Sequence, residues 1–365
     1  MKHYTYLHFF MHHNAVFATA LCRLINLPEN HFDVGEHAFI TTHRNVYDAL
    51  QDYENVFYFE DASHSADVIN QYGDSGDVLI VHSMPPVMKA LKIKRRFRRK
   101  IIWRTWGHDI GFRTDASLSV KNFSKKALNY LWRREVRSFI GIGVANVVDV
   151  INMQKHFGDV KTFGMAYPHG NYKDRCEQLK AEAIPSDGCA NILVGHSAHP
   201  ADNHIAILEK LTPCLQEGKA KCFLVLSYGE DAYRDRVVSY VEEHQLPNVE
   251  IIRDFMERDD YIRFLNRMDA AVFDSKGSYA LGNITILLRL GKKIYLNENG
   301  ILAEAFRKEH VPYGRTDTLR EDVDSLTSPV DYSECRGSSL FGLPYEERIR
   351  QWHEALSSAL PDRKS

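Results

Sequence analysis

Short apolar runs alternate with amphipathic segments along nearly the whole chain. In the first half, runs rich in Val, Ile, Phe and Tyr are typical of strands and cover residues 4–10, 36–42, 56–60, 77–83, 100–106, 139–145 and 160–168. The run 160–168 is either a last strand or the segment by which the chain leaves the sheet. Helical spacing is found over 14–26 and over 147–158, where Gly158 supplies a C-cap. This alternation predicts a parallel sheet covered by helices.

A second alternation begins after the polar segment 171–189, which ends in Pro, Ser, Asp and Gly and is predicted to be a linker. Strands are predicted over 190–195, 221–229, 248–256, 270–275 and 292–297. The expected fold is therefore α/β, with two tandem doubly wound Rossmann-like domains that face each other across a cleft. The expected boundaries are 1–175 and 190–345, with a closing helix in 346–365 that packs back on the N-terminal domain.

Composition narrows the class of protein. A chain of 365 residues exceeds what one core usually holds, and 44% hydrophobic with 26% charged residues is ordinary for a globular protein. Six cysteines without a C-x-x-C pair indicate reduced thiols. The first 26 residues lack a signal-peptide pattern, and no run approaches the roughly 18 apolar residues of a membrane span. We expect a cytoplasmic protein.

Positive charge is concentrated in one stretch. Eight basic residues and no acid lie in Lys89–Lys100, and residues 85–137 hold sixteen Lys or Arg against three acids, a surplus of thirteen. Apolar residues intervene, among them Leu91, Ile93 and Phe97. Such a mixture fits shallow insertion into an anionic membrane surface, which we favour; a solvated helix face and a nucleic-acid site are the alternatives. No nucleic-acid-binding module is recognisable, so no nucleic acid partner is expected.

Candidate chemistry gathers where the strands of the second half end. Four such loops, within 195–203, 227–229, 253–256 and 274–283, share one edge of a parallel sheet and therefore one crevice. In the last, Gly277 lets the backbone approach a ligand, and the following helix N-terminus attracts an anion such as a diphosphate. A tight turn is the alternative. No Walker A loop is present, and the glycines of "GIGVAN" lie within a strand.

Several segments, in order, resemble a known family. "FMHHN", "WRTWGHD", "NILVGHSAHPADNHIAILEKL", "FLVLSYG", "DDYIRFLNRMDAAVF" and "LGNITILLRLGKKIYLNEN" are similar to the bacterial 4-acetamido-4,6-dideoxy-galactose (Fuc4NAc) transferases of glycosyltransferase family 56. The resemblance covers nearly the whole chain and implies that the two α/β domains form a GT-B fold. Gly195-His196-Ser197 replaces the family's glycine-asparagine-serine triplet, and "SKGSYALGN" replaces its Gln-rich phosphate loop.

The resemblance implies roles for particular residues. The nucleotide-sugar donor would be bound by Gly195, Ser197, Asn203, Ser227, Tyr228, Gly229, Gly277, Ser278, Leu281, Gly282, Asn283 and Glu298, with Asn297 beside them. The acceptor side would be formed by His12, Asn14 and Trp106. The catalytic groups would be His13, His108 and Asp109.

Glycosyl transfer needs a base for the acceptor hydroxyl and positive charge for the departing diphosphate. Asp109, at a strand end beside Trp103 and Trp106, is the first candidate for the base and His13 the second; a turn or helix-cap role is the alternative for Asp109. Metal-dependent nucleotide-sugar enzymes typically present an Asp-x-Asp pair at a strand end. Such a pair occurs here only at Asp322 and Asp324, in a polar segment better interpreted as surface helix. We expect no metal and no cofactor besides the nucleotide diphosphate sugar.

These observations predict a peripheral-membrane glycosyltransferase at the inner face of the plasma membrane. It would move Fuc4NAc or a related sugar from a nucleotide diphosphate to a polyprenyl-diphosphate-linked saccharide in bacterial surface-polysaccharide synthesis, as in enterobacterial common antigen. A nucleotide-sugar 2-epimerase on the same fold and a non-catalytic nucleotide- or sugar-binding protein are the alternatives.

Overall fold

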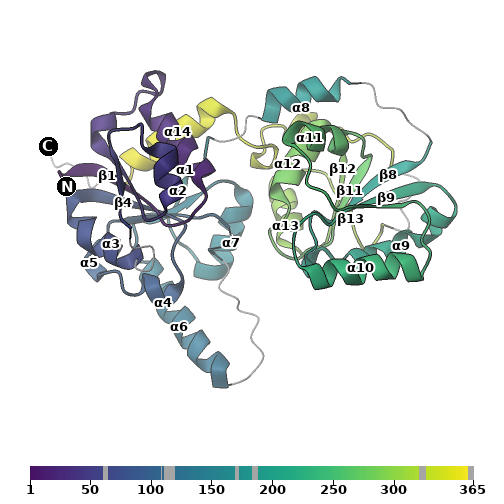
Figure 1. The fold of residues 1–365 in the computed structure, drawn as a ribbon, viewed down its shortest axis with the longest axis horizontal. Coiled ribbons are helices and arrows are strands. Elements are labelled where there is room, and N and C mark those ends of the chain that lie inside the picture. The colour runs from purple at the N-terminus through teal and green to yellow at the C-terminus, as the bar shows by residue number, and fades with distance from the viewer. Residues whose placement is uncertain are drawn as a thin grey trace. The chain divides into compact units, whose positions relative to one another are not determined.

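The chain forms two compact α/β units, which are considered separately (Figure 1). The computed structural model describes residues 1–60, 65–107, 109–110, 120–168, 172–182, 188–319 and 326–360. Unit 1 consists of Met1–Gly170 and Leu343–Ser365, and unit 2 of Asn171–Gly342.

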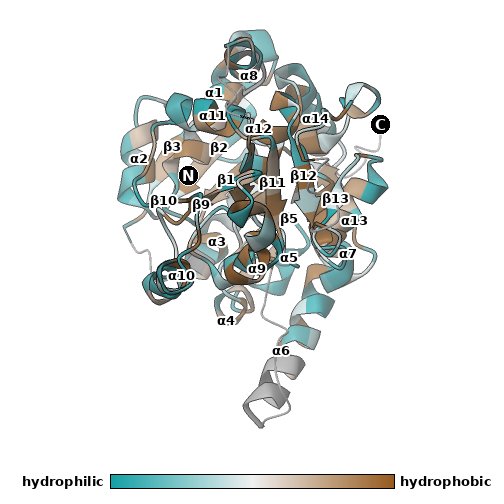
Figure 2. Cartoon of the chain, turned by 90° about the vertical axis from the view of Figure 1, so that its right-hand side faces the viewer, coloured by the Kyte–Doolittle hydropathy of each residue, from teal (hydrophilic) through white to brown (hydrophobic). Residues whose placement is uncertain are grey.

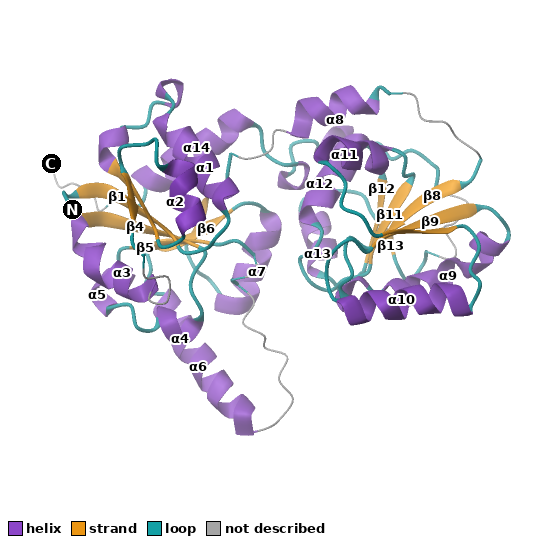
Figure 3. Ribbon diagram, viewed as in Figure 1, coloured by secondary structure: helices purple, strands orange, loops and turns teal. Residues whose placement is uncertain are grey.

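Unit 1 is built on a seven-stranded parallel sheet of order β3-β2-β1-β4-β5-β6-β7, shown in orange in Figure 3. Its strands are β1 Tyr4–Phe10, β2 His37–Thr41, β3 Val56–Tyr58, β4 Gly76–His82, β5 Ile101–Arg104, β6 Gly141–Val144 and β7 Thr162–Gly164. Its helices are α1 Ala15–Asn26, α2 Arg44–Leu50, α3 Ser65–Tyr72, α4 Val87–Ala90, α5 Arg95–Arg98, α6 Val120–Val136, α7 Val147–Phe157 and α14 Tyr345–Ser357.

Both faces of this sheet are buried, as a parallel sheet requires. Leu7 and Phe9 of β1 pack with residues of α3, α5, α6 and α7, whereas Tyr6 and Phe10 pack with α1 and α14. The closing helix α14 thus lies in unit 1, where the buried Trp352 donates from Nε1 to the Ala166 carbonyl at 2.9 Å.

Unit 2 has a six-stranded parallel sheet of order β10-β9-β8-β11-β12-β13. Its strands are β8 Ala190–Val194, β9 Ala220–Val225, β10 Val249–Ile252, β11 Ala270–Phe273, β12 Lys293–Leu296 and β13 Gly314–Arg315. The central strands β11 and β12 are coloured mainly as hydrophobic in Figure 2. Its helices are α8 Tyr172–Lys180, α9 His204–Gln216, α10 Asp231–Glu243, α11 Arg258–Asn266, α12 Leu281–Leu290 and α13 Ile301–Lys308. The predicted two-domain α/β architecture is confirmed.

Two features of unit 2 differ from the sequence expectation. The segment predicted as a linker contains α8, which packs on α11 and α12; Arg175 pairs with Asp259 at 2.6 Å, and Asn266 donates to the Leu179 carbonyl. The sixth strand, β13, is two residues long and has no apolar run to reveal it.

The basic stretch Lys89–Lys100 differs from expectation in its apolar residues. Ile93 and Phe97 are 1% and 0% exposed within the core, so they cannot insert into a membrane. Arg98 is also buried, paired with Glu135 at 2.7 Å. The exposed cations are Lys89, Lys92, Lys94, Arg95, Arg96 and Arg99. Among the described helices, none is both long enough and apolar enough to cross a membrane.

A chain of buried polar rings runs across the sheet of unit 1. His8, in the middle of β1, is hydrogen-bonded through Nδ1 to His82 of β4 at 3.1 Å and through Nε2 to His37 of β2 at 3.0 Å. His82 continues to the Tyr167 hydroxyl, which accepts from Trp106 Nε1 at 2.8 Å. Neutral imidazoles, each one donor and one acceptor, satisfy this chain without placing a charge in the core.

Burial governs the charge of these histidines. It lowers the pKa of His8 and His82 well below the usual range, with His37 and Arg104 as lesser causes respectively. It lowers the pKa of His37 to about 4, an effect that the nearby Asp33 opposes and His353 reinforces. As the pH falls, these histidines take up protons in the unfolded chain before they do so in the folded one. The stability that their neutral state contributes to unit 1 is therefore fully present above about pH 6.5 and is lost as the pH falls toward 4.

We predict that unit 1 unfolds with acid in this window. His37 alone contributes about 3 kcal/mol to the loss, at about 1.4 kcal/mol per pKa unit. Urea unfolding between pH 4 and 8 measures it, and His37→Phe should flatten the dependence. His31→Asn, at an exposed position with a φ of 58° that Asn adopts readily, should leave it unchanged. Equal slopes in all three proteins would contradict this account.

Candidate active site

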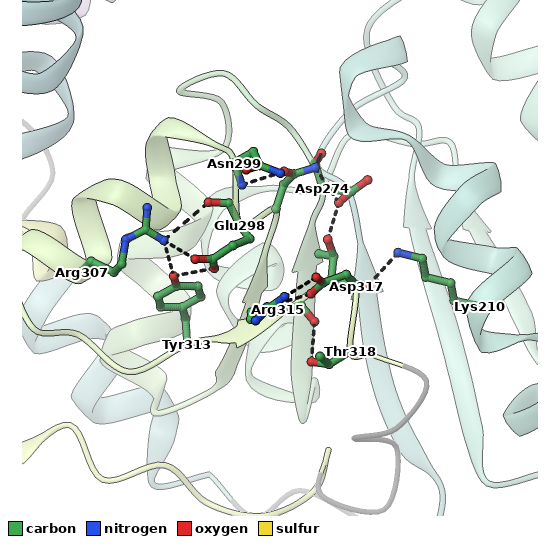
Figure 4. A network of polar contacts seen from close by, with 11 residues as sticks. Lys210, Asp274, Glu298, Asn299, Arg307, Tyr313, Arg315, Asp317 and Thr318 are labelled. Carbon is green, nitrogen blue, oxygen red and sulfur yellow. Dashed lines mark hydrogen bonds and ion pairs between the residues drawn. The ribbon is translucent and has the colours of Figure 1, made fainter.

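Asp274 joins the loops at the carboxyl edge of the sheet in unit 2 (Figure 4). It directly follows β11 and accepts from Asn203 Nδ2 at 2.7 Å, from Asn297 Nδ2 at 3.1 Å and from the Thr316 hydroxyl. These partners come from the loops after β8, β12 and β13. One carboxylate therefore fixes the position of four strand ends.

The loop between Asp274 and α12 is shaped for a close ligand. The buried Ser275 accepts from the Gly277 N–H at 3.0 Å, and a Cβ on Gly277 would lie 2.6 Å from the Tyr279 ring. Ala280 takes a φ of 62°, and among the described residues no side chain caps α12. A Cβ on Gly282 would meet no described atom within 4 Å. The positive end of α12 thus has open space before its first turn, as an anion site requires.

The loops after β8 and β9 are joined to each other. The Ala198 N–H donates to the Tyr228 carbonyl at 2.6 Å, and Glu230 N–H donates to the Ala198 carbonyl at 2.8 Å. Gly229 has a φ of 124°, and its Cβ would lie 2.6 Å from the Ala198 carbonyl oxygen. Gly195, with a φ of 70°, likewise admits no side chain, because a Cβ would lie 2.4 Å from His204 Nε2.

Several aromatic side chains of these loops lie close to one another. Tyr228 is 52% and Tyr279 41% exposed. The His196 ring lies between them, with centroids 6.2 Å and 6.1 Å away, and His199 lies 5.0 Å from Tyr279. Exposed rings at a strand-end crevice provide surfaces on which a base or sugar can stack.

Of the predicted donor residues, the structure brings together Gly195, Ser197, Asn203, Tyr228 and Gly229 through the contacts between these loops. Ser227, Gly277, Ser278, Leu281 and Gly282 lie in the same loops or at the start of α12.

Other predicted donor residues are occupied by contacts within the protein. Asn283 donates from Nδ2 to the Tyr261 hydroxyl at 2.9 Å. Glu298 accepts from Arg307 at 2.7 Å and from the Tyr313 hydroxyl at 2.9 Å, as Figure 4 shows. These side chains position the loops, and a ligand would share them with those partners.

In unit 1, the predicted residues after β1 and β5 also meet. The His12 ring lies 4.1 Å from that of His13 and 4.9 Å from that of Trp106. His13 is exposed at the end of β1. Asn14 caps α1, because its Oδ1 accepts from the Val16 N–H at 3.0 Å. Among the predicted residues of unit 1 that the structure describes, His13 is thus the exposed one, and Asn14 has a helix-cap role.

Asp109 is buried, at 8% exposure, in a turn. Its Oδ2 accepts from Trp103 Nε1 at 2.8 Å and from the Met84 N–H at 3.0 Å, and its Oδ1 accepts from the Trp106 N–H at 2.8 Å. Three donors on one carboxylate fit a positioning role better than that of a free base. His108, Asp322 and Asp324 lie outside the described residues.

Three residues of this site were missed from the sequence as site residues: His196, Asp202 and Tyr279. The first two are bonded to each other, which only the fold reveals. Tyr279 lay within the predicted phosphate loop, and its aromatic ring beside glycines was the available signal.

Comparison with solved structures defines the class. The chain is similar to HepE of Anabaena in complex with UDP and glucose, at 14% identity over 98% of this chain and 100% of that one, with a TM-score of 0.60. It is also similar to a glycosyltransferase of Rickettsia africae, at 14% identity over 99% and 96%, with a TM-score of 0.56. The fold is that of GT-B glycosyltransferases.

The sequence gives the family within this class. Residues 12–360 match the family described as 4-alpha-L-fucosyltransferase glycosyl transferase group 56, and the chain belongs to it. The resemblance to family 56 is thereby confirmed, and the chain is a glycosyltransferase.

We predict that Asp274→Ala destabilises unit 2 by about 1–3 kcal/mol, because it leaves the buried Thr316 hydroxyl and the half-buried Asn297 amide without this acceptor. Urea unfolding measures the change. Asp317→Ala, in the same polar network but pairing with Arg315 on the exposed side, is the control and should have no measurable effect. Equal losses in the two variants would show that Asp274 does not tie the loops together.

Proposed function

We propose that this glycosyltransferase moves Fuc4NAc, or a related aminodeoxy sugar, from a nucleotide diphosphate to a polyprenyl-diphosphate-linked saccharide. The observation that carries the donor half is the open, uncapped start of α12 beside the Asp274-anchored loops of unit 2. HepE binding UDP supports a nucleotide sugar as donor. Membership of family 56, described as fucosyltransferases, supports a deoxy sugar as the transferred group. The lipid-linked acceptor rests on the resemblance of the sequence to the Fuc4NAc transferases.

In this proposal the acceptor binds at unit 1. His13 takes the proton of the acceptor hydroxyl, because its ring is exposed at the end of β1. Trp106 and His12 form the adjoining surface, and Asp109 holds the Trp106 turn in place. The helix amides of α12 stabilise the departing diphosphate. The proposed reaction needs neither a metal nor a further cofactor.

The direct test is transfer with a panel of nucleotide sugars and a lipid-linked saccharide. Appearance of the extended saccharide together with free nucleoside diphosphate supports the proposal. Epimerised sugar released without an acceptor would instead identify a 2-epimerase, and nucleotide binding without turnover a binding protein.

We predict that Gly282→Val weakens nucleoside diphosphate binding at least tenfold. The added side chain occupies the open space in front of the helix, while valine suits a helix no less than glycine, so folding is preserved. Calorimetry with UDP and dTDP measures the affinity. Gly337→Val, where a Cβ also meets no described atom within 4 Å, is the control and should bind normally. Unchanged binding by the Gly282 variant would show that the loop is a simple turn that does not bind the diphosphate.

We predict that His13→Ala lowers turnover by about 10²–10⁴ without changing donor affinity. Asp109→Asn should lower both turnover and melting temperature, because an amide cannot accept from all three donors that Asp109 serves. Steady-state kinetics and thermal unfolding separate the two effects. His43→Gln, in the neighbouring loop, is the control. If His13→Ala is fully active while Asp109→Asn is stably folded but inactive, Asp109 and not His13 is the base.

We also propose that the exposed cations of Lys89–Lys100 bind the anionic inner surface of the plasma membrane, aided by Met88, which is 64% exposed. Charges near such a surface contribute about 1 kcal/mol each and are screened over about 8 Å at physiological salt. Binding therefore needs anionic lipid and weakens with salt.

We predict that replacing Lys89, Lys92, Arg95 and Arg99 with Gln abolishes co-sedimentation with anionic vesicles and spares nucleotide binding. Arg98 is left intact because it is buried against Glu135. The control replaces four exposed cations of unit 2, namely Arg236, Arg267, Lys308 and Arg336. If both variants sediment like the parent, the basic stretch is only a solvated surface.

A further inference from the structure

A buried carboxylate organises the loop after β8. Asp202 is 1% exposed, and its Oδ2 accepts from the His196 N–H at 3.2 Å, the Ser197 N–H at 3.1 Å and the Ser197 hydroxyl at 3.2 Å. Its Oδ1 lies 2.9 Å from His196 Nδ1. Four contacts to two consecutive residues fix both the backbone of the loop and the orientation of the imidazole.

Asp202 carries a negative charge in this setting. Burial by itself raises the pKa of Asp202. The hydrogen bond and charge of His196, together with a backbone N–H, lower this pKa by more than burial raises it, so the pKa lies below the ordinary value. An ionised carboxylate facing Nδ1 holds a proton on that nitrogen. His196 Nε2 is then the nitrogen available to a ligand.

The position of His196 is what connects it to the donor. Only 13% of its side chain is exposed, and Nε2 lies 3.4 Å from Ser197 Oγ, a long contact for a hydrogen bond. The ring lies between Tyr228, after β9, and Tyr279, in the loop leading to α12. It therefore lies where the three loops assigned to the donor meet.

The other titratable neighbours do not compete for this role. His204 lies on the buried side, where burial lowers its pKa to about 4, with Asp202 opposing and His196 reinforcing the shift. It stays neutral at physiological pH. His199 accepts through Nδ1 from the Ala201 N–H at 3.1 Å and so acts as a cap.

We propose that His196 is a catalytic residue whose protonated imidazole donates from Nε2 to the departing nucleoside diphosphate, and that Asp202 is its positioning residue. The proposal rests on the proposed function. As the bond between the anomeric carbon and the phosphate oxygen breaks, its electron pair stays on that oxygen. The acceptor oxygen forms the new bond and its proton passes to the base. His196 keeps its own proton and stabilises the added charge on the diphosphate.

The test compares His196→Asn, His196→Gln and Asp202→Asn with the full-length parent. Affinity for UDP, dTDP and their nucleotide sugars is measured by calorimetry from pH 5.5 to 8.5, together with turnover. Because the terminal phosphate of a free nucleoside diphosphate titrates in the same range, the measured quantity is the difference between parent and variant. The nucleotide sugars lack that titration and give the same difference directly.

We expect the His196 variants to bind about tenfold more weakly than the parent and to lose at least tenfold in turnover, with the larger difference at the acid end of the range because only a protonated imidazole donates from Nε2. Asp202→Asn should change affinity and turnover in the same direction, because a neutral amide no longer holds the imidazole in place. His310→Asn is the matched control: it lies at an exposed position of unit 2 outside the donor loops, with a φ of 54° that asparagine adopts readily, so its affinity and pH profile should equal those of the parent.

Three results would overturn the proposal. In the first, folded His196 variants bind and turn over like the parent at every pH. In the second, His310→Asn loses as much as the His196 variants do. In both cases the proposed function stands, since the parent still binds and transfers. In the third, the parent neither binds a nucleotide nor transfers a sugar, and the proposed function falls together with this inference.

Discussion

The hydrogen bonds to Asp274 are the constraint on which the donor side depends. In a parallel sheet every strand ends at the same edge, but nothing in the sheet itself holds the loops beyond that edge together. Asp274 follows a central strand and binds side chains from loops after β8, β12 and β13. The glycine-bearing loop to α12 starts from this fixed point, so the open start of the helix has a defined place relative to its neighbours.

Much of the fold could be predicted, because buried parallel strands are short apolar runs and their order along the chain dictates which ends share an edge. The failures have physical reasons. Helix α8 is polar and is stabilised by tertiary partners such as Asp259, which local pattern does not show. The two residues of β13 carry no apolar signal. Ile93 and Phe97 lie among cations, so the local pattern does not show that both belong to the core, where tertiary packing places them.

The candidate site shows a sharper division. Which residues gather at a strand end follows from topology: Gly195 and Tyr228 lie in the loops after β8 and β9, which contact each other, and Gly282 lies in the first turn of α12. What each side chain does depends on its hydrogen-bond partners, which lie far away in sequence. Asn14 caps a helix, and Glu298 is held by Arg307. A motif therefore predicts the location of a residue better than its role.

The histidines of this chain illustrate how surroundings set the role of one residue type. His8 and His82 are fully buried and hydrogen-bonded to each other, so neutrality is the only state that the core accommodates. His196 instead contacts the ionised carboxylate of Asp202 through Nδ1, and part of its ring is exposed to solvent. The first arrangement excludes positive charge and stabilises a fold at neutral pH. The second tolerates positive charge at the place where the proposed reaction releases a negative one.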